Sequence, residues 1–184
     1  MQLARPGPEH LASYVAALER GWSDNERGVE AAREELSRIQ ADAAAFLVGM
    51  EDPEGKGPPV TLPDGSAAKR LPGVKRWLWD GEFCGSIGLR WQHGTTVLPP
   101  HCLGHIGYAV VPWKQRLGYA TSALRLILPE ARLVGLPFVE ITTDPDNVAS
   151  RRVIEANGGN LVERFIKPQQ FGCKPGLRFR ITLT

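Results

Sequence analysis

The stretch that most constrains the fold of this chain runs from residue 104 to 123 and reads GHIGYAVVPWKQRLGYATSA. An apolar run over residues 106–111 predicts a strand, which Pro112 ends. After the following turn, apolar residues recur at helical spacing: Leu124, Ile127, Leu128 and Ala131. The first turn of a helix leaves backbone amides without partners and carries the positive end of the helix dipole, and Gly118 lets a ligand oxygen approach the main chain. The stretch therefore predicts an anion site at a strand–turn–helix junction.

The residues of this turn belong to a larger pattern. Residues 115–120 read QRLGYA and fit the pattern Q/R-x-x-G-x-G/A, and the segment DNVASRRVIEANGG follows over residues 146–159. Together these motifs resemble the GNAT N-acetyltransferase superfamily, and the resemblance extends from Trp77 to the C-terminus. The N-x-x-S helix and the GHIGY strand look closest to the branch that contains ribosomal-protein N-terminal acetyltransferases and uncharacterised bacterial relatives.

The resemblance implies an α/β (α+β) fold. We expect a mixed, mostly antiparallel sheet of about six to seven strands, flanked by helices. Its two central parallel strands, over residues 106–111 and 137–143, would be joined by a right-handed helical crossover. In this family the first of them carries a bulge and splays from the second, which opens a V-shaped split.

Hydrophobic periodicity and turn signals predict the other elements. Further strands are predicted over residues 1–5, 74–79, 82–91, 160–166 and 177–183. Helices are predicted over residues 8–22, 25–48 and 147–157, the last with Asp146 as N-cap. Asp80-Gly81 is a strong signal for a hairpin, whose tryptophans we expect in the core. Residues 50–73, rich in proline and glycine, predict a flexible loop or a substrate-covering lid.

The composition limits the partners and the compartment. The chain has 184 residues, of which 42% are hydrophobic, and a formal net charge of +2. This length suits one domain over residues 1–184, and so small a charge argues against a nucleic-acid partner. The three cysteines form no C-x-x-C pair, and no stretch is apolar enough for a signal peptide or a membrane span. We therefore expect a cytoplasmic protein without disulfides or membrane contact.

The resemblance also implies acetyl-CoA as co-substrate and names the residues that would bind it. The pantetheine arm would pair with the main chain of Val110 and Val111, much as an added strand would. The pyrophosphate would lie on the backbone amides of the turn: Gln115, Arg116, Leu117, Gly118, Tyr119 and Ala120. Asn147 and Ser150 would contact the arm near its sulfur end, although an Asx residue after a strand is also typical of a helix cap.

Candidate catalytic residues follow in part from the same resemblance. The tyrosine that commonly protonates the departing thiolate in this family is absent, because Ile154 occupies its position. Ser150, one helical turn after Asn147, is the candidate acid, and the alternative is a hydrogen bond to CoA without proton transfer. An amide at Val110 or Val111 would stabilise the oxyanion. Spacing alone fixes none of the candidate bases: Glu163, His105, Tyr108, Asp144 and Glu82.

Two functions remain open at this point. The first is direct, ternary-complex transfer of an acetyl group from acetyl-CoA to a primary amine, with no covalent enzyme intermediate. The second is a non-catalytic acyl-CoA-binding or sensing domain, which the missing tyrosine leaves open. The sequence does not determine whether the amine belongs to a small molecule, a peptide or a protein N-terminus, or whether the chain forms a homodimer. Four residues suggest a metal site without matching any zinc spacing, so none is predicted: His93, His101, Cys102 and His105.

Overall fold

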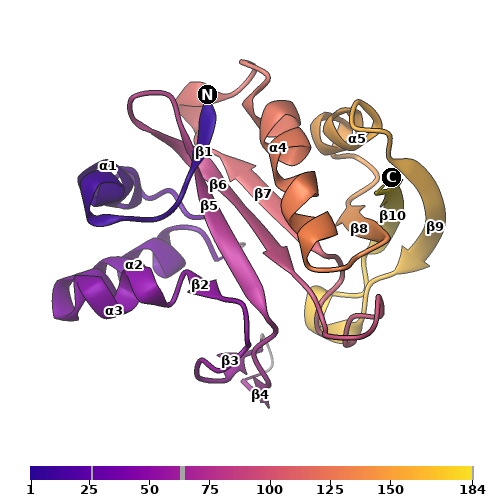
Figure 1. Cartoon of the computed structure of the whole chain (residues 1–184), viewed down its shortest axis with the longest axis horizontal. Helices are drawn as coiled ribbons and strands as arrows, with labels where there is room; N and C mark the ends of the chain where they lie inside the picture. Colours follow the sequence, from indigo (N-terminus) through magenta and orange to yellow (C-terminus); the bar gives the residue numbers. More distant parts are fainter. Residues whose placement is uncertain (26, 63–64, 184) are drawn as a thin grey trace.

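The strands of the chain form two main sheets that lie side by side (Figure 1). In the computed structural model, which describes residues 1–25, 27–62 and 65–183, both sheets are antiparallel. The first sheet has the order β1 (Gln2–Ala4), β5 (Gly73–Trp79), β6 (Phe83–Arg90) and β7 (Ile106–Val110), and β2 (Glu51–Asp52) also pairs with β5. The second has the order β8 (Phe138–Thr143), β10 (Pro175–Thr182) and β9 (Asn160–Ile166).

The predicted fold class is confirmed, with two differences in the sheet. The sequence predicts a single mixed sheet whose two central strands are parallel and part at one end. In the structure β7 and β8 belong to different sheets, so the V-shaped split separates the two along most of their length. The predicted bulge in β7 is also absent, since the pairing of β6 with β7 keeps its register from Leu89↔Ile106 to Gly85↔Val110. Register shifts occur instead between Leu78 and Trp79 and between Arg178 and Phe179.

Helices cover the two faces of the first sheet (Figure 1). On one face lie α1 (Pro8–Glu19), α2 (Val29–Ala41) and α3 (Ala43–Val48), and on the other lies α4 (Tyr119–Leu133). The core under α1 is aromatic, with Tyr14 stacked on the buried Trp77 at 4.6 Å between ring centroids. The core under α4 and α5 (Val148–Glu155) contains buried residues from both sheets, such as Leu89 and Val139. The two sheets therefore share one hydrophobic core.

The predicted hairpin is confirmed, and the predicted helix over residues 25–48 needs a correction. The hairpin turns at Asp80-Gly81, where Gly81 has a φ of 112°. The helix is broken at Asp42, whose backbone is extended (φ −160°) and whose Oδ1 accepts the amide of Ala45 at 2.9 Å. An aspartate that caps a new helix competes with continuation of the preceding one, so two helices form.

The segment over residues 50–73 contains more structure than the sequence predicted. Besides β2, it contains the short strands β3 (Val60–Thr61) and β4 (Ala67–Ala68), which pair with each other. The carboxylate of Asp52 accepts the amides of Lys56 at 2.9 Å and Gly57 at 2.8 Å, which fixes a tight turn. The segment is therefore not structureless, and its role as a flexible loop or a lid stays a prediction. Part of that prediction, residues 63–64, lies outside the described residues.

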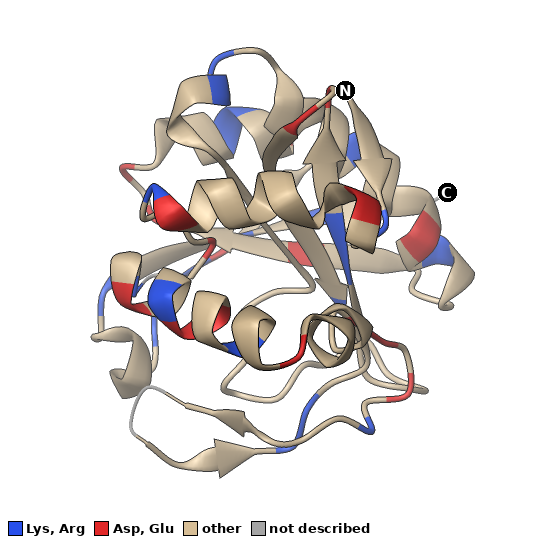
Figure 2. Ribbon diagram, turned by 90° about the vertical axis from the view of Figure 1, so that its left-hand side faces the viewer, with Lys and Arg blue, Asp and Glu red and all other residues tan. Residues whose placement is uncertain are grey.

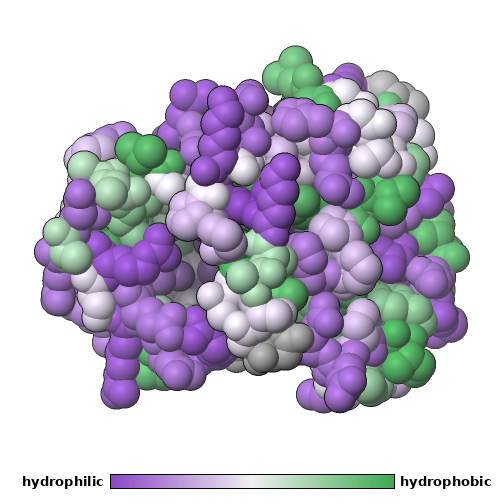
Figure 3. Space-filling model, turned by 90° about the horizontal axis from the view of Figure 1, so that it is seen from below, coloured by the Kyte–Doolittle hydropathy of each residue, from purple (hydrophilic) through white to green (hydrophobic). Residues whose placement is uncertain are grey.

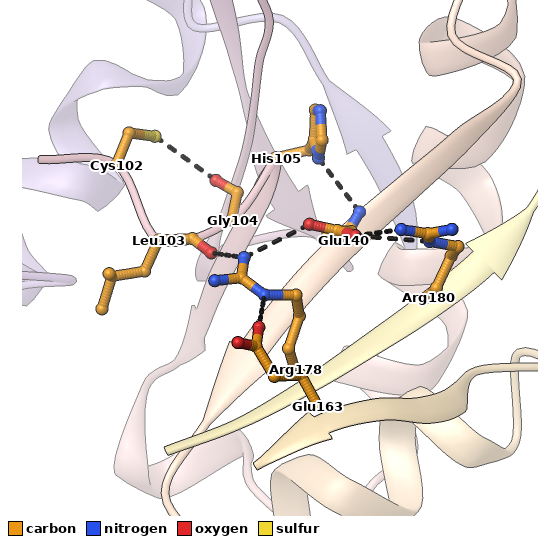
Figure 4. Close-up of polar contacts among 8 residues, drawn as sticks. All are labelled: Cys102, Leu103, Gly104, His105, Glu140, Glu163, Arg178 and Arg180. Atoms are coloured by element: carbon orange, nitrogen blue, oxygen red, sulfur yellow. Dashed lines mark hydrogen bonds and ion pairs between the residues drawn. The ribbon is translucent and has the colours of Figure 1, made fainter. Parts of the chain in front are cut away.

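A cluster of polar side chains joins the two sheets where β7 begins (Figure 4). The amide of His105 donates to the carbonyl of Glu140 at 2.7 Å, and the amide of Glu140 donates to Nδ1 of His105 at 3.0 Å. Arg178 donates to the carbonyl of Leu103 at 2.9 Å and to the Glu140 carboxylate at 3.2 Å, while Arg180 donates to the same carboxylate at 2.7 Å. Beyond this cluster, no backbone hydrogen bond links the described residues of β7 and β8. The cluster therefore forms the closed end of the split.

The surface carries charges of both signs. On the side of α1 and α2, Lys and Arg positions are interspersed with Asp and Glu positions (Figure 2). Seen from below, hydrophobic and hydrophilic side chains are intermixed (Figure 3). Within the described residues, no helix has the length and apolar character needed to cross a membrane.

Candidate functional site

The open part of the split holds a cleft of about 360 Å³. Its walls come from β7, β8, the start of α5 and the segments on either side of these elements. The polar side chains that line this cleft include Arg90, Tyr108, Asp144, Asn147, Ser150 and Lys167. The strands diverge here: among the described residues, the backbone hydrogen bond that links them lies at the closed end, from the amide of His105 to the carbonyl of Glu140.

The turn between β7 and α4 presents backbone amides without protein acceptors. Helix α4 begins at Tyr119, and its N-cap Gly118 has a left-handed backbone (φ 75°). Since the first helical bond runs from the amide of Ser122 to the carbonyl of Gly118 at 3.0 Å, the amides of residues 119–121 have no intrahelical acceptor. No side chain caps this helix, and Arg116 also has a positive φ of 64°. Convergent amides at the positive end of a helix dipole suit an anion.

Asp80 anchors this turn from the β5–β6 hairpin. Its carboxylate accepts the hydroxyl of Tyr119 at 2.6 Å and the ammonium of Lys114 at 3.0 Å, and these hydrogen bonds hold the pKa of Asp80 well below its usual range. Lys114 also pairs with Glu82 at 2.7 Å. The charge of Lys114 is thus balanced within the protein. Arg116 is exposed and forms no ion pair with any residue that the structure describes, so its charge is available to a ligand.

Tyr108 and Ser150 form a hydroxyl pair in the cleft. Their oxygens are 3.0 Å apart, and the Tyr108 hydroxyl also donates to the backbone carbonyl of Ser150 at 3.3 Å. Burial raises the pKa of Tyr108 to about 12, so its hydroxyl stays protonated at neutral pH. The amide of Ser150 donates to Oδ1 of Asn147 at 3.0 Å, which makes Asn147 the N-cap of α5 in place of the predicted Asp146. Ile154, at the position of the family tyrosine, is buried in the core.

The backbone of β7 offers partners to an extended ligand, though not at both predicted residues. The amide of Val111 donates to the carbonyl of Cys84 at 3.0 Å, so it is not available as an oxyanion donor. Hydrogen-bonded and non-bonded residues alternate along an antiparallel strand, so the backbone groups of Val110 and Tyr108 face away from β6, toward the split. The carbonyl of Val110 accepts Nε2 of Gln115 at 3.3 Å, in agreement with this direction.

The structure separates the candidate bases. Asp144 and Tyr108 line the cleft, and Asp144 pairs with Lys167. His105 is buried at the closed end, where burial lowers its pKa and its Nδ1 accepts the amide of Glu140. Glu163 pairs with Arg178 at 2.7 Å and lines a second hollow of about 670 Å³, beside the other face of β8.

Sequence reasoning missed three residues of this site. Asp80 was read only as a turn residue, and its spacing from Tyr119 gave no sign that the hairpin reaches the turn before α4. Arg90 ends β6 and Lys167 follows β9, and both enter the cleft only through tertiary structure. The pairing of Gly88 with Gly107, two glycines opposite each other that leave room for the Arg90 side chain, likewise appears only in the structure.

Comparison with known families identifies the class of protein to which this two-sheet fold, with its open split and bare helix N-terminus, belongs. The sequence matches the family described as "Acetyltransferase (GNAT) domain" over residues 8–160. Because this match covers most of the chain, the protein belongs to the GNAT acetyltransferase family, as the resemblance of its motifs predicted. No curated protein matches the sequence significantly.

Several solved structures share the fold. The microcin C7 self-immunity acetyltransferase MccE, in complex with acetyl-CoA and AMP, has a TM-score of 0.64 at 12% identity, with 98% of this chain and 91% of that one covered. RimL, a ribosomal L7/L12 α-N-protein acetyltransferase in complex with CoA, has a TM-score of 0.60 at 13% identity, with 98% and 93% covered. An acetyltransferase from Salmonella typhimurium that modifies the N-terminal serine of L7/L12 has a TM-score of 0.58 at 14% identity, with 99% and 94% covered.

Proposed function

We propose that this protein transfers the acetyl group of acetyl-CoA directly to a primary amine within a ternary complex. The observation that carries the proposal is the arrangement of the bare amides before α4 and the Tyr108–Ser150 pair along one open split. The solved neighbours that hold acetyl-CoA or CoA support the choice of donor. A core shared by both sheets supports one domain over residues 1–184.

The donor would bind mainly through the main chain. Its diphosphate would lie on the amides of residues 116–120, with Arg116 adding a positive charge. The predicted amide of Gln115 is not available, because it donates to the carbonyl of Pro112 at 3.4 Å. The pantetheine arm would run along the side of β7 that faces the split, where Tyr108 and Val110 direct their backbone groups. On this path the sulfur would lie near Asn147 and Ser150, at the start of α5.

The reaction then needs few groups. The neutral amine attacks the thioester carbon, the new C–N bond forms, and the amide of Val110 stabilises the oxyanion. As the C–S bond breaks, Ser150 passes its proton to the departing sulfur and takes the proton of the Tyr108 hydroxyl along their hydrogen bond. Tyr108 is then reprotonated from solvent, so that both hydroxyls are restored before the next turnover. The proton lost by the amine nitrogen passes to Asp144, which lines the cleft. An amine with a pKa near 8 would be partly neutral at physiological pH and would need little help from a base.

The experiment that tests this function measures thiol release from acetyl-CoA across a panel of amines and peptides, with mass spectrometry of the products. Transfer to at least one amine, without an acetylated enzyme intermediate, is the expected result. Tight binding of acetyl-CoA without any amine-dependent thiol release would instead favour a non-catalytic acyl-CoA-binding domain.

A further inference from the structure

Arg90 is a charged side chain in the cleft that the proposed chemistry does not use. It is exposed at the end of β6 and lines the cleft together with Tyr108 and Ser150. Its guanidinium lies over Gly107, because a Cβ at Gly107 would lie only 2.9 Å from Nη2 of Arg90. A side chain on residue 107 would therefore displace this guanidinium. Because residue 107 is glycine, the guanidinium has room beside the split.

The guanidinium of Arg90 has no ionic partner among the described parts of the chain. Among the residues that the structure describes, no carboxylate lies within ion-pair distance of Arg90, and the neutral thiol of Cys102 is a polar group close to it. Asp24 interacts with Arg90 electrostatically, but its carboxylate is engaged by Lys75 at 2.7 Å and by Ser86 at 2.5 Å. Arg90 thus presents donors in a fixed fork that suits a carboxylate.

The position of Arg90 points to the acceptor rather than to the donor. Gly107 and Tyr108 are consecutive residues of β7, so they face opposite sides of the strand. Tyr108 faces Ser150 and α5, where the thioester is proposed to lie, and Arg90 lies on the other side, over Gly107. A group bound to Arg90 would therefore reach the split from the side opposite the donor.

The charge of the cleft restricts what that group can be. The charged side chains that line it are two cations, Arg90 and Lys167, and one carboxylate, Asp144, which pairs with Lys167. A single positive charge remains, and it would balance one carboxylate better than a phosphate dianion. We infer that the acceptor is an amine that carries a carboxylate close to the reacting nitrogen, and that Arg90 binds this carboxylate. The inference rests on the proposed acetyl transfer, and it names the class of acceptor.

A binding experiment tests Arg90 without requiring turnover. N-acetylglycine and N-acetylglycinamide, which differ in the carboxylate, are titrated into the full chain in the presence of CoA and followed by NMR. We expect the wild type to bind N-acetylglycine about 10- to 100-fold more tightly, as one hydrogen-bonded charge pair predicts. Arg90→Gln should abolish this difference, Arg90→Lys should restore part of it, and Gly107→Ala should weaken it. As a control, Arg33→Gln removes one positive charge from an exposed site on α2 and should leave the difference in affinity between the two probes unchanged.

Turnover then distinguishes the source of the carboxylate. A free amino acid is compared with its amide, and a dipeptide amide with aspartate in second position is compared with its asparagine counterpart. A higher kcat/KM for the free amino acid than for its amide identifies the acceptor as an amino acid. A higher kcat/KM for the aspartate dipeptide than for its asparagine counterpart identifies it as an acidic peptide. Arg90→Gln should remove either preference. Equal binding of the two probes by the wild type, or a preference that survives Arg90→Gln, overturns the inference. Acetyl-CoA binding without thiol release on any amine refutes the proposed function instead, while the probes still decide the role of Arg90.

Discussion

Gly118 offers a direct test of the anion site before α4. Its φ of 75° is left-handed, and a Cβ built there has no atom within 4 Å. Alanine in this conformation costs about 1–2 kcal/mol, of which about 0.4–1 kcal/mol is offset by the lower entropy of the unfolded chain. Gly118→Ala should therefore lower the free energy of unfolding by about 1 kcal/mol, or Tm by about 2–4 °C.

The loss of affinity for acetyl-CoA should be much larger than this loss of stability. The new methyl group would occupy space that the diphosphate needs to reach the amides, and a hydrogen bond to a charged group contributes about 1.5–3 kcal/mol. The loss of one such bond raises Kd about 10- to 150-fold. Calorimetric titration with acetyl-CoA and with CoA measures this change.

Gly135 provides a matched control at the other end of the same helix. Its φ is 84°, and a Cβ there also meets nothing within 4 Å. Gly135→Ala should therefore lose a similar amount of stability and keep its affinity for acetyl-CoA. If Gly118→Ala binds acetyl-CoA as tightly as Gly135→Ala does, the diphosphate does not lie on these amides and the proposed donor site is wrong.

Ser150→Ala should lower kcat about 100-fold with little change in the Kd for acetyl-CoA, since a general acid typically contributes at least this factor. A normal kcat in steady-state assays would exclude Ser150 as the acid. Tyr108→Phe loses the hydrogen bond to Ser150 and should lower kcat about 5- to 10-fold, whereas an effect larger than that of Ser150→Ala would make Tyr108 the acid. Burial raises the pKa of Glu35 above its ordinary 4.5. As the pH rises, the unfolded chain therefore loses the Glu35 proton at a lower pH than the folded protein does. Wild-type stability in urea should therefore fall relative to Glu35→Gln as the pH rises from 4.5 through the folded pKa, and a constant difference would contradict this sign. Arg178→Met removes the bonds to Leu103 and Glu140 and should lower the free energy of unfolding by about 1–3 kcal/mol; a loss below about 0.5 kcal/mol would mean that this cluster does not hold the split closed at its end.

The elements with strong local signals were predicted correctly. The Asp80-Gly81 hairpin and the strand–turn–helix around Gly118 follow from turn chemistry and hydrophobic periodicity, which act over a few neighbouring residues. The predicted helix over residues 25–48 failed at Asp42, where a local cap outweighed a continuous apolar stripe. The bulge predicted in β7 failed because it came from the family resemblance and not from any residue of this strand.

The candidate site could be predicted only in part. The resemblance pointed to Asn147 and Ser150, and Tyr108 was one of five candidate bases; the structure brings all three to one cleft. Glu163 and His105 were equally plausible in sequence, yet ion pairing with Arg178 and burial at the closed end place them elsewhere. Spacing could not separate these cases, because residues on different strands have no fixed relation until the sheets pack.

The sequence by itself determined the order of the main elements, the strand–turn–helix around Gly118 and the family, because each depends on residues that are neighbours along the chain. Only the tertiary structure decided that the strands form two sheets, that Asp80 anchors the turn, and that Arg90 faces the cleft from the side opposite Ser150. The physical reason is that a cleft between two sheets depends on where the strands separate and on contacts between residues far apart in the chain. Neither produces a hydrophobic periodicity that the sequence would reveal.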